Sequence, residues 1–139
     1  KRFSIRDGMG IERLRELAGV ETGIITRENS GIVESRARKL KIEELHLGVI
    51  EKGKTFDEIL SRRNLTAEEV AFIGDDTNAI EIMGKAGLTA CPNDATIFAK
   101  NVSDIIVKSR GGYGAVRDFA ELIITAKQKV IINKKGQNA

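Results

Sequence analysis

The sequence predicts an α/β fold: a three-layer, Rossmann-like parallel sheet with helices on both faces. Two observations predict it. Short apolar runs alternate with segments whose apolar residues recur at helical spacing, and the run Val70–Ile73 ends in Gly74-Asp75-Asp76. Open α/β sheets build their sites beyond such strand ends. The 139 residues, 41% hydrophobic and 31% charged, suit one globular domain, which we expect over 1–132, with a disordered tail over 133–139.

Each expected element follows from a local pattern. A helix is expected over 10–17, where Ile11 and Leu14 fall on one face, and a strand over 20–26. A second helix is expected from its N-cap Ser30 to Leu40. The remaining pattern predicts, in chain order, a strand over 45–49, a helix over 55–63, a capping box at Thr66–Glu69, a strand over 70–74, a helix over 80–85, a strand over 88–90, a helix over 95–100, a strand over 104–107 and a long helix over 113–130.

Composition narrows the class of protein. The lone Cys91 excludes an internal disulfide, and with His46 alone it does not make a zinc site, so we expect a reducing, cytoplasmic location. The low aromatic content and a net charge of +3 argue against nucleic acid as a partner. No apolar run approaches the ~20 residues of a membrane helix, and we expect no membrane association.

The adjacent acids Asp75 and Asp76 are the first candidate site. Two carboxylates followed by Thr77-Asn78 offer oxygen ligands to a hard divalent cation such as Mg²⁺, which would in turn neutralise a phosphate. The alternative is an ordinary strand-to-helix turn, in which Asp76 or Asn78 caps a helix that starts near Ala79.

Two further side chains follow other strands. Thr26 ends a strand in a hydroxyl that can donate to a phosphoryl oxygen, although a threonine here can also cap the next helix. Lys52 follows a third strand and can supply positive charge to a phosphate. Lys54 competes for that role, and either lysine can simply be solvated.

The order of hydroxyl, lysine and acids resembles the second, third and fourth motifs of the haloacid-dehalogenase superfamily of phosphotransferases. Two segments, Phe3–Ile11 and Arg110–Asp118, look like signatures of its small subfamily without a cap domain, which dephosphorylates 3-deoxy-octulosonate 8-phosphate and 3-deoxy-nonulosonate 9-phosphates. The resemblance implies a homotetramer in which a neighbouring subunit closes the site. Gly111 and Gly112 would let backbone approach the substrate closely, or they form a flexible connection.

The sequence departs from the family pattern in two places. The superfamily's nucleophile is the first aspartate of an Asp-x-Asp segment, and no such segment occurs in these 139 residues. Asp7 lies at an expected helix start and is no substitute, so we expect the chain to begin after the motif and to lack the central strand of the sheet. The second departure is Ala79, where the family often has another aspartate, and weaker metal binding is expected.

The resemblance implies a mechanism for the complete protein. The absent aspartate would attack a phosphate ester and form an aspartyl-phosphate that water hydrolyses. Mg²⁺ would be held by Asp75, with Asp76 orienting the shell, while Thr26 and Lys52 would hold the phosphoryl oxygens. The alternative is a non-catalytic oligomerisation domain of the kind fused to sialic-acid cytidylyltransferases.

Substrate choice is predicted from the loop and helix that follow Thr26. Arg27 and Glu28 lie on the expected loop, and Arg36 and Lys39 are three residues apart on one helical face, so we expect these charges at a common edge of the site. Mixed charge suits a sugar acid with several hydroxyls, and the resemblance favours a nine-carbon acid 9-phosphate. The alternative is a solvated helix with no such role.

Overall fold

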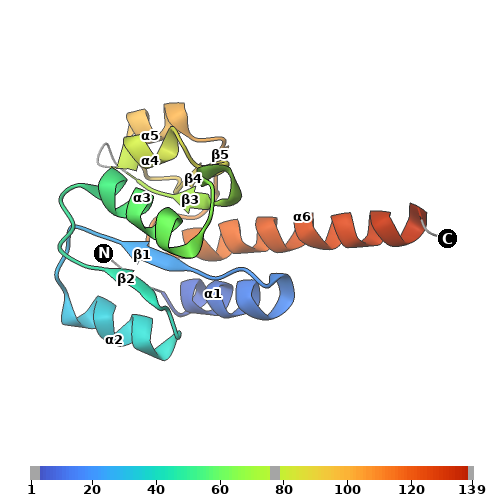
Figure 1. Cartoon of the computed structure of the whole chain (residues 1–139), viewed down its shortest axis with the longest axis horizontal. Coiled ribbons are helices and arrows are strands. Elements are labelled where there is room, and N and C mark those ends of the chain that lie inside the picture. The colour runs from blue at the N-terminus through green and yellow to red at the C-terminus, as the bar shows by residue number, and fades with distance from the viewer. Residues whose placement is uncertain (1–3, 76–78, 138–139) are drawn as a thin grey trace.

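The computed structural model describes residues 4–75 and 79–137, and it has the alternating helices and strands of an α/β fold (Figure 1). In chain order the elements are α1 (Ile5–Ala18), β1 (Gly23–Ile25), α2 (Gly31–Lys39), β2 (Glu44–His46), α3 (Lys52–Arg63), the 3₁₀ turn η1 (Ala67–Glu69), β3 (Ala71–Ile73), α4 (Ile80–Met83), β4 (Leu88–Cys91), α5 (Ile97–Val102), β5 (Ile105–Ile106) and α6 (Ala115–Gln137). The predicted element types are confirmed, whereas several boundaries differ.

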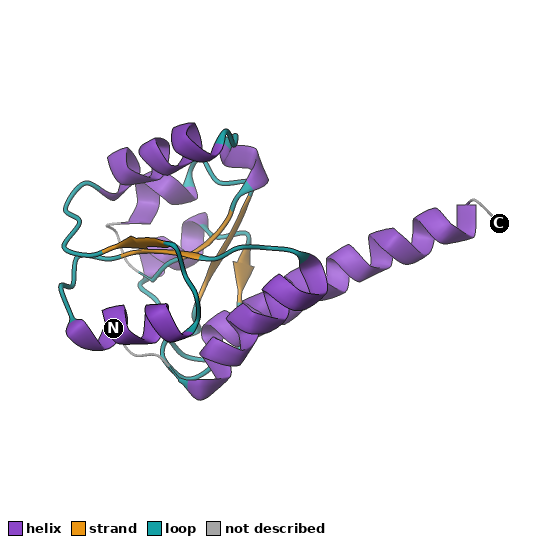
Figure 2. Ribbon diagram, turned by 60° about the horizontal axis from the view of Figure 1, so that its bottom comes forward, coloured by secondary structure: helices purple, strands orange, loops and turns teal. Residues whose placement is uncertain are grey.

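Helices cover both faces of the strands, as predicted (Figure 2). On one face, α1, α2 and α6 supply most of the buried apolar clusters: Ile11, Ile24, Val33, Ala37 and Ile42 in one, Ala90, Val107, Ala115 and Phe119 in the next, and Leu14, Ala120 and Ile124 in the third. On the other face, Phe56 of α3, Ile82 of α4 and Ala99 of α5 are buried. The three-layer arrangement therefore buries apolar side chains on both faces of the strands.

All the strand pairs are parallel, but they form two sheets instead of one. In the first sheet β1 pairs with β2, with Ile24 opposite Leu45, and the second has the order β3-β4-β5, with Phe72 opposite Thr89. Within the described residues no ladder joins β1 to β3. The break lies where we expected the central strand to be lacking.

The ends of α1 and α6 differ from the predicted ones for local reasons. Helix α1 starts at Ile5, earlier than expected, because Ser4 and Asp7 form a reciprocal capping box. Helix α6 runs to Gln137, beyond its expected end at residue 130 and into the segment 133–139 that we expected to be a tail. Even α6 lacks the long apolar stretch that a membrane crossing requires, as do the other described helices.

Asp7 joins the starts of α1 and α6. Its side chain is 1% exposed; one carboxylate oxygen accepts from the backbone N–H groups of Val116 (3.0 Å) and Arg117 (3.2 Å), and the other accepts from Ser4 N (3.4 Å). The carboxylate thus satisfies N–H groups in the first turn of α6 and places negative charge at its positive end. The two signature segments seen in the sequence meet at this contact.

Close packing continues along the two helices. A Cβ atom added to Gly10 would lie 2.9 Å from the Cα of Arg117, so only glycine allows the helices to approach this closely. One turn further on, Glu121 accepts hydrogen bonds from both Arg13 (3.1 Å) and Arg117 (2.9 Å). The side chains of α1 and α6 therefore interlock from the first turn of α6 onward.

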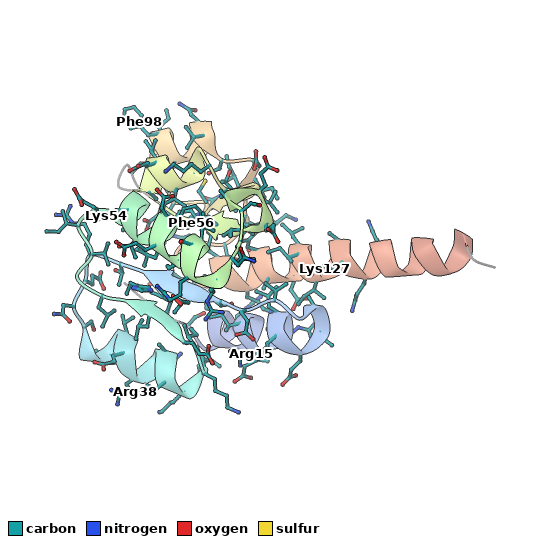
Figure 3. The ribbon with its side chains drawn as sticks, viewed as in Figure 1. Arg15, Arg38, Lys54, Phe56, Phe98 and Lys127 are labelled. Atoms are coloured by element: carbon teal, nitrogen blue, oxygen red, sulfur yellow. The ribbon has the colours of Figure 1, made fainter. Side chains whose placement is uncertain are left out.

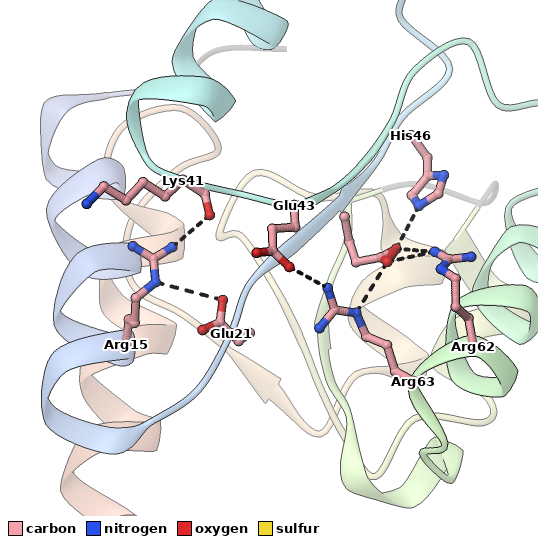
Figure 4. Close-up of polar contacts among 8 residues, drawn as sticks. Arg15, Glu21, Lys41, Glu43, His46, Arg62 and Arg63 are labelled. Atoms are coloured by element: carbon pink, nitrogen blue, oxygen red, sulfur yellow. Dashed lines mark hydrogen bonds and ion pairs between the residues drawn. The ribbon is translucent and has the colours of Figure 1, made fainter.

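A second polar cluster fastens α3 to β2 (Figure 4). Glu44, whose side chain is 12% exposed, accepts from Arg62 (2.6 Å) and lies near Arg63 (3.2 Å) and His46 (3.0 Å). The hydrogen bond from Arg62 lowers the pKa of Glu44 to about 2, and those from His46 and Arg63 act in the same direction. The charged form of Glu44 is therefore favoured by folding.

We expect replacement of Asp7 by alanine to lower the free energy of unfolding by about 2–4 kcal/mol, because it leaves buried N–H groups of α6 without an acceptor. Asp7→Asn, which retains one acceptor oxygen, should lose about half as much. Urea denaturation measures both. Asp57→Ala, which removes only an exposed ion pair with Lys85, is the control and should cost less than about 1 kcal/mol. Equal losses of unfolding free energy in Asp57→Ala and Asp7→Ala would show that Asp7 does not join α1 to α6.

Acid titration tests the Glu44 cluster. Because its folded pKa is depressed, the stability that Glu44 contributes is present above pH 4.5 and is lost as the pH falls toward about 2. Glu44→Gln should be less stable by about 1.5–3 kcal/mol at pH 7 and should show a shallower loss in acid. Urea midpoints from pH 7 to 2.5 measure this. The exposed Glu16→Gln is the matched control, and identical acid profiles for Glu44→Gln and the parent chain would contradict the assignment.

Candidate functional site

The carboxyl ends of the strands lie at one edge of each parallel sheet, and the connections that follow them hold the candidate side chains. Thr26 follows β1, Lys52 begins α3 after β2, and Asp75 follows β3. The predicted sequence order of hydroxyl, lysine and acid is thus an order of successive strand ends.

Thr26 is held in a buried turn. It is 3% exposed, its N–H donates to the carbonyl of His46 (3.0 Å), and its hydroxyl oxygen accepts from Glu28 N (3.1 Å). Ser30 caps α2, so Thr26 does not have the capping role that was the alternative. Because Oγ is used as an acceptor, the O–H of Thr26 can still donate.

Lys52 occupies the first position of α3 against the usual electrostatic preference. The first turn itself contains no acidic residue and the N-cap Glu51 makes no side-chain capping bond, but the carboxylate of Glu81 from α4 lies against Gly53. A cation beside the positive end of a helix is unfavourable unless an anion is present, and helix starts are themselves anion sites. Lys52 is half-buried, whereas Lys54 is exposed and projects outward (Figure 3). Lys52 is therefore the better candidate of the two.

The connections that hold Thr26 and Lys52 are bonded to each other. Val49 N donates to the carbonyl of Thr26 (2.9 Å), and Gly48 N donates to that of Glu28 (3.0 Å). Gly48 has φ +64°, a left-handed conformation that glycine adopts at little cost. The structure therefore brings together the turn of Thr26 and the segment that leads to Lys52.

Asp75 is exposed directly after β3, and its carbonyl accepts from Thr96 N (3.0 Å) at the start of α5. Its predicted partner Asp76 lies outside the described residues. Among the described residues, no three acidic, histidine or cysteine side chains gather into a metal site. A single carboxylate is a hard oxygen donor, so Asp75 fits one ligand position for a divalent cation.

Ala79 stands where the family often has a further aspartate, and its position shows the effect of this difference. It is 2% exposed, and its Cβ lies 2.9 Å from the position that a Cβ on Gly74 would take. The alanine therefore packs beneath the strand end and offers no oxygen to the edge where Asp75 lies.

The charged residues predicted to recognise the substrate are divided between two places. Arg27 and Glu28 are exposed on the turn after β1. Arg36 and Lys39 instead line a groove of about 170 Å³ between α1 and α2, which Glu28 does not line. Arg36 donates to the carbonyl of Ser4 (3.4 Å).

The expectation that Glu28, Arg36 and Lys39 share one edge of the site therefore stays a prediction. Lys39 is eight residues beyond the start of α2, about 12 Å along the helix axis, so the helix carries it away from the strand ends. Sequence spacing placed Arg36 and Lys39 on one face correctly, but it did not account for this distance.

Gly111 and Gly112 lie in the connection between β5 and α6. Two aspartate side chains bind backbone N–H groups of this connection. Asp94 accepts from Gly111 N (2.8 Å), and Asp118 accepts from Ser109 N (2.9 Å). Donation from Gly111 N lowers the pKa of Asp94, and the charge of Arg110 adds to the effect. Asp94 was not among the residues predicted from the sequence, although an acid shortly after the strand β4 was the available indication.

Comparison with known proteins identifies the family to which the chain belongs. The family model described as haloacid dehalogenase-like hydrolase matches residues 23–119. The 3-deoxy-D-manno-octulosonate 8-phosphate phosphatase of Escherichia coli K12 is 34% identical over 138 residues, which cover 99% of this chain and 72% of that protein.

Two solved structures have the same fold. The cobalt-bound 3-deoxy-octulosonate 8-phosphate phosphatase of Haemophilus influenzae has a TM-score of 0.87 and 32% identity, covering 93% of this chain and 75% of that one. The Moraxella catarrhalis phosphatase, in complex with magnesium, phosphate and the sugar acid, has a TM-score of 0.88 and 29% identity, covering 96% and 78%.

The position of Lys52 predicts opposite effects on binding and stability. Lys52→Gln should weaken binding of inorganic phosphate by roughly tenfold or more. The same change should leave the free energy of unfolding unchanged or raise it by up to about 0.5 kcal/mol, because it removes a cation from a helix start. Calorimetric titration and urea denaturation measure the two quantities, with Lys54→Gln as the matched control. A loss of stability without a loss of phosphate binding would make Lys52 structural.

Proposed function

Because the chain belongs to the haloacid dehalogenase-like hydrolase family, we propose that it provides the phosphate-binding and metal-binding part of a sugar-phosphate phosphatase. The observation that supports this most directly is the alignment of Thr26, Lys52 and Asp75 at successive strand ends, each in a setting suited to an anion or a cation. The reaction is the hydrolysis of a phosphate monoester.

The substrate class is a 3-deoxy-ulosonic acid phosphate. The relatives described above are named for the eight-carbon 8-phosphate, which supports that substrate for this chain. The nine-carbon acid was favoured by the resemblance at Glu28, Arg36 and Lys39, whereas neither relative described by its substrate above is named for a nine-carbon acid. We therefore propose the octulosonate 8-phosphate as the first substrate to test.

Each residue has a separate task in the proposed reaction. The O–H of Thr26 donates to a phosphoryl oxygen, and the ammonium of Lys52 offsets the charge on the phosphoryl group as it redistributes. The carboxylate of Asp75, together with Asp76 outside the described residues, would hold Mg²⁺. When bound, this cation neutralises phosphate charge and orients the ester.

The attacking carboxylate is not among these residues, since the sequence contains no Asp-x-Asp segment. We propose that the 139-residue chain binds phosphate without hydrolysing its esters, because no nucleophile is in position. Hydrolysis would require the family's amino-terminal motif. The non-catalytic oligomerisation alternative predicts no hydrolysis even when that motif is supplied.

We also propose a homotetramer in which a neighbouring subunit covers the strand ends. Exposed apolar side chains next to the edge support this: Ile97 and Phe98 are 69% and 59% exposed at the start of α5, just beyond the Thr96 N–H that binds Asp75, and Phe98 projects from the surface (Figure 3). Apolar area of this kind is often covered in oligomers. Sedimentation velocity gives the oligomeric state.

The decisive experiment supplies the missing motif. A chain extended with the Asp-x-Asp segment of a family member should hydrolyse octulosonate 8-phosphate with Mg²⁺, while the 139-residue chain should show no turnover above background. In the extended chain, Asp75→Asn should lower kcat/KM at least about 100-fold, because an anionic ligand of a hard cation is lost. Asp57→Asn, an exposed acid of α3, is the matched control.

Three results would contradict these expectations separately. Turnover by the 139-residue chain would show that the absent carboxylate is not needed. Unchanged magnesium dependence in Asp75→Asn would remove Asp75 from the metal shell. An inactive extended chain would favour the oligomerisation alternative, and a higher kcat/KM for a nonulosonate 9-phosphate would restore the nine-carbon assignment.

A further inference from the structure

The connection between β5 and α6, residues 109–114, is a fixed turn. We call it the β5–α6 loop. Its backbone accepts and donates at several points: Tyr113 N donates to the carbonyl of Arg110 (3.0 Å), and Asp94 and Asp118 accept from Gly111 N and Ser109 N as described above. Gly112 and Gly114, with φ of +76° and +111°, have conformations that other residues rarely adopt. The backbone of this loop therefore has a defined conformation, which fixes where its side chains begin.

Arg110 is the cation that this turn presents. Its side chain is 69% exposed, and its guanidinium lies 5.7 Å from the centre of the Tyr113 ring. The aromatic face orients the guanidinium without using its N–H groups. Arg110 Nε lies 3.7 Å from Asp94 Oδ2, while the other oxygen of Asp94 accepts from Gly111 N, so Asp94 faces only the Nε edge of the guanidinium. Most of the hydrogen-bonding capacity of Arg110 thus remains available to a ligand.

A second guanidinium approaches the same loop from α1. Arg6 Nε lies 3.5 Å from the position that a Cβ on Gly114 would take, and so does the hydroxyl oxygen of Ser109. Arg6 is exposed, and within the described part of the chain it has no carboxylate partner. It also lies in the first turn of α1, where a positive charge opposes the helix dipole. An anion at the β5–α6 loop would offset both unfavourable features.

The distance from this loop to the phosphate end of the site fits the proposed substrate. The loop follows β5, which lies two strands from β3 in the order β3-β4-β5, and Asp75 follows β3. Two strand spacings are about 10 Å. An ulosonate 8-phosphate carries its carboxylate on the first carbon and its phosphate on the eighth, so its two anionic groups lie at opposite ends of the molecule.

We propose that Arg110, assisted by Arg6, binds the carboxylate of the sugar acid and thereby distinguishes ulosonate phosphates from uncharged sugar phosphates. The inference rests on the proposed function. The guanidinium of Arg110 matches a carboxylate in shape and charge, and Gly111 and Gly112 leave room beside it for the substrate's ring. The loop is thus a specificity element at the end of the site remote from the phosphate.

Binding of the free sugar acid tests this without catalysis. The affinity of the 139-residue chain for 3-deoxy-octulosonate is compared with its affinity for the methyl ester, which has the same hydroxyls and no charge. The parent chain should prefer the acid by roughly 10- to 100-fold, the range expected for hydrogen bonds to a charged group. Arg110→Gln should abolish this preference, Arg110→Lys should retain part of it, and Arg6→Gln should reduce it.

Arg38→Gln is the matched control, because Arg38 is an exposed arginine of α2 whose ion pair among the described residues is with Glu34, and it should keep the full preference. Circular dichroism of each variant verifies folding. If Arg110→Gln keeps the preference, or if the parent chain shows none while the extended chain hydrolyses ulosonate phosphates, the inference is wrong and the proposed function stands. If the parent chain binds no sugar acid and the extended chain hydrolyses only simple phosphate esters, the proposed substrate class fails and the inference fails with it.

Discussion

The buried carboxylate of Asp7 is the contact on which the arrangement of the two sheets depends. By accepting from the first N–H groups of α6 it fixes where that helix starts, and the start of α6 touches both halves of the fold. Val116 packs against the cluster of β1 and α2, while Phe119, one turn later, is buried with residues of β4 and β5. A helix that began elsewhere would lose one of these two contacts. A charged group is retained in the interior because it satisfies N–H groups that apolar packing leaves without partners.

The same contact explains why the two segments that first suggested a subfamily lie at opposite ends of the chain. The segment around Asp7 supplies the acceptor, and the segment from Arg110 to Asp118 supplies both the helix start and the turn that precedes it. Gly10 then allows α1 and α6 to run side by side. Residues with no direct part in chemistry can thus determine the position of a loop at the strand ends, because that loop is anchored by the helix that follows it.

Local sequence patterns predicted the element types well, because periodicity, capping residues and turn residues act over a few positions. Ser30 and the Thr66–Glu69 capping box are confirmed for this reason. Contacts between distant residues were not predictable in this way. The pairing of Asp94 with Gly111 joins two loops that the sequence places 17 residues apart. The groove lined by Arg36 and Lys39 of α2 together with residues of α1 is a further contact of this kind, because it depends on how two helices pack. The length of α6 was underestimated because lysine-rich ends favour helices as well as disorder.

Because the strands form two separate sheets, a ligand that contacts both of them would also link the two halves of the fold. Thr26 and the segment leading to Lys52 are attached to the β1–β2 sheet, whereas Asp75, Asp94 and Arg110 are attached to the β3–β4–β5 sheet. Any molecule that contacts both groups bridges the seam between them, where no backbone ladder joins the described strands. Its binding energy therefore opposes separation of the halves, and by linkage it adds to the stability of the whole chain. A ligand bound at the strand ends of both sheets would therefore hold the two halves of the molecule together.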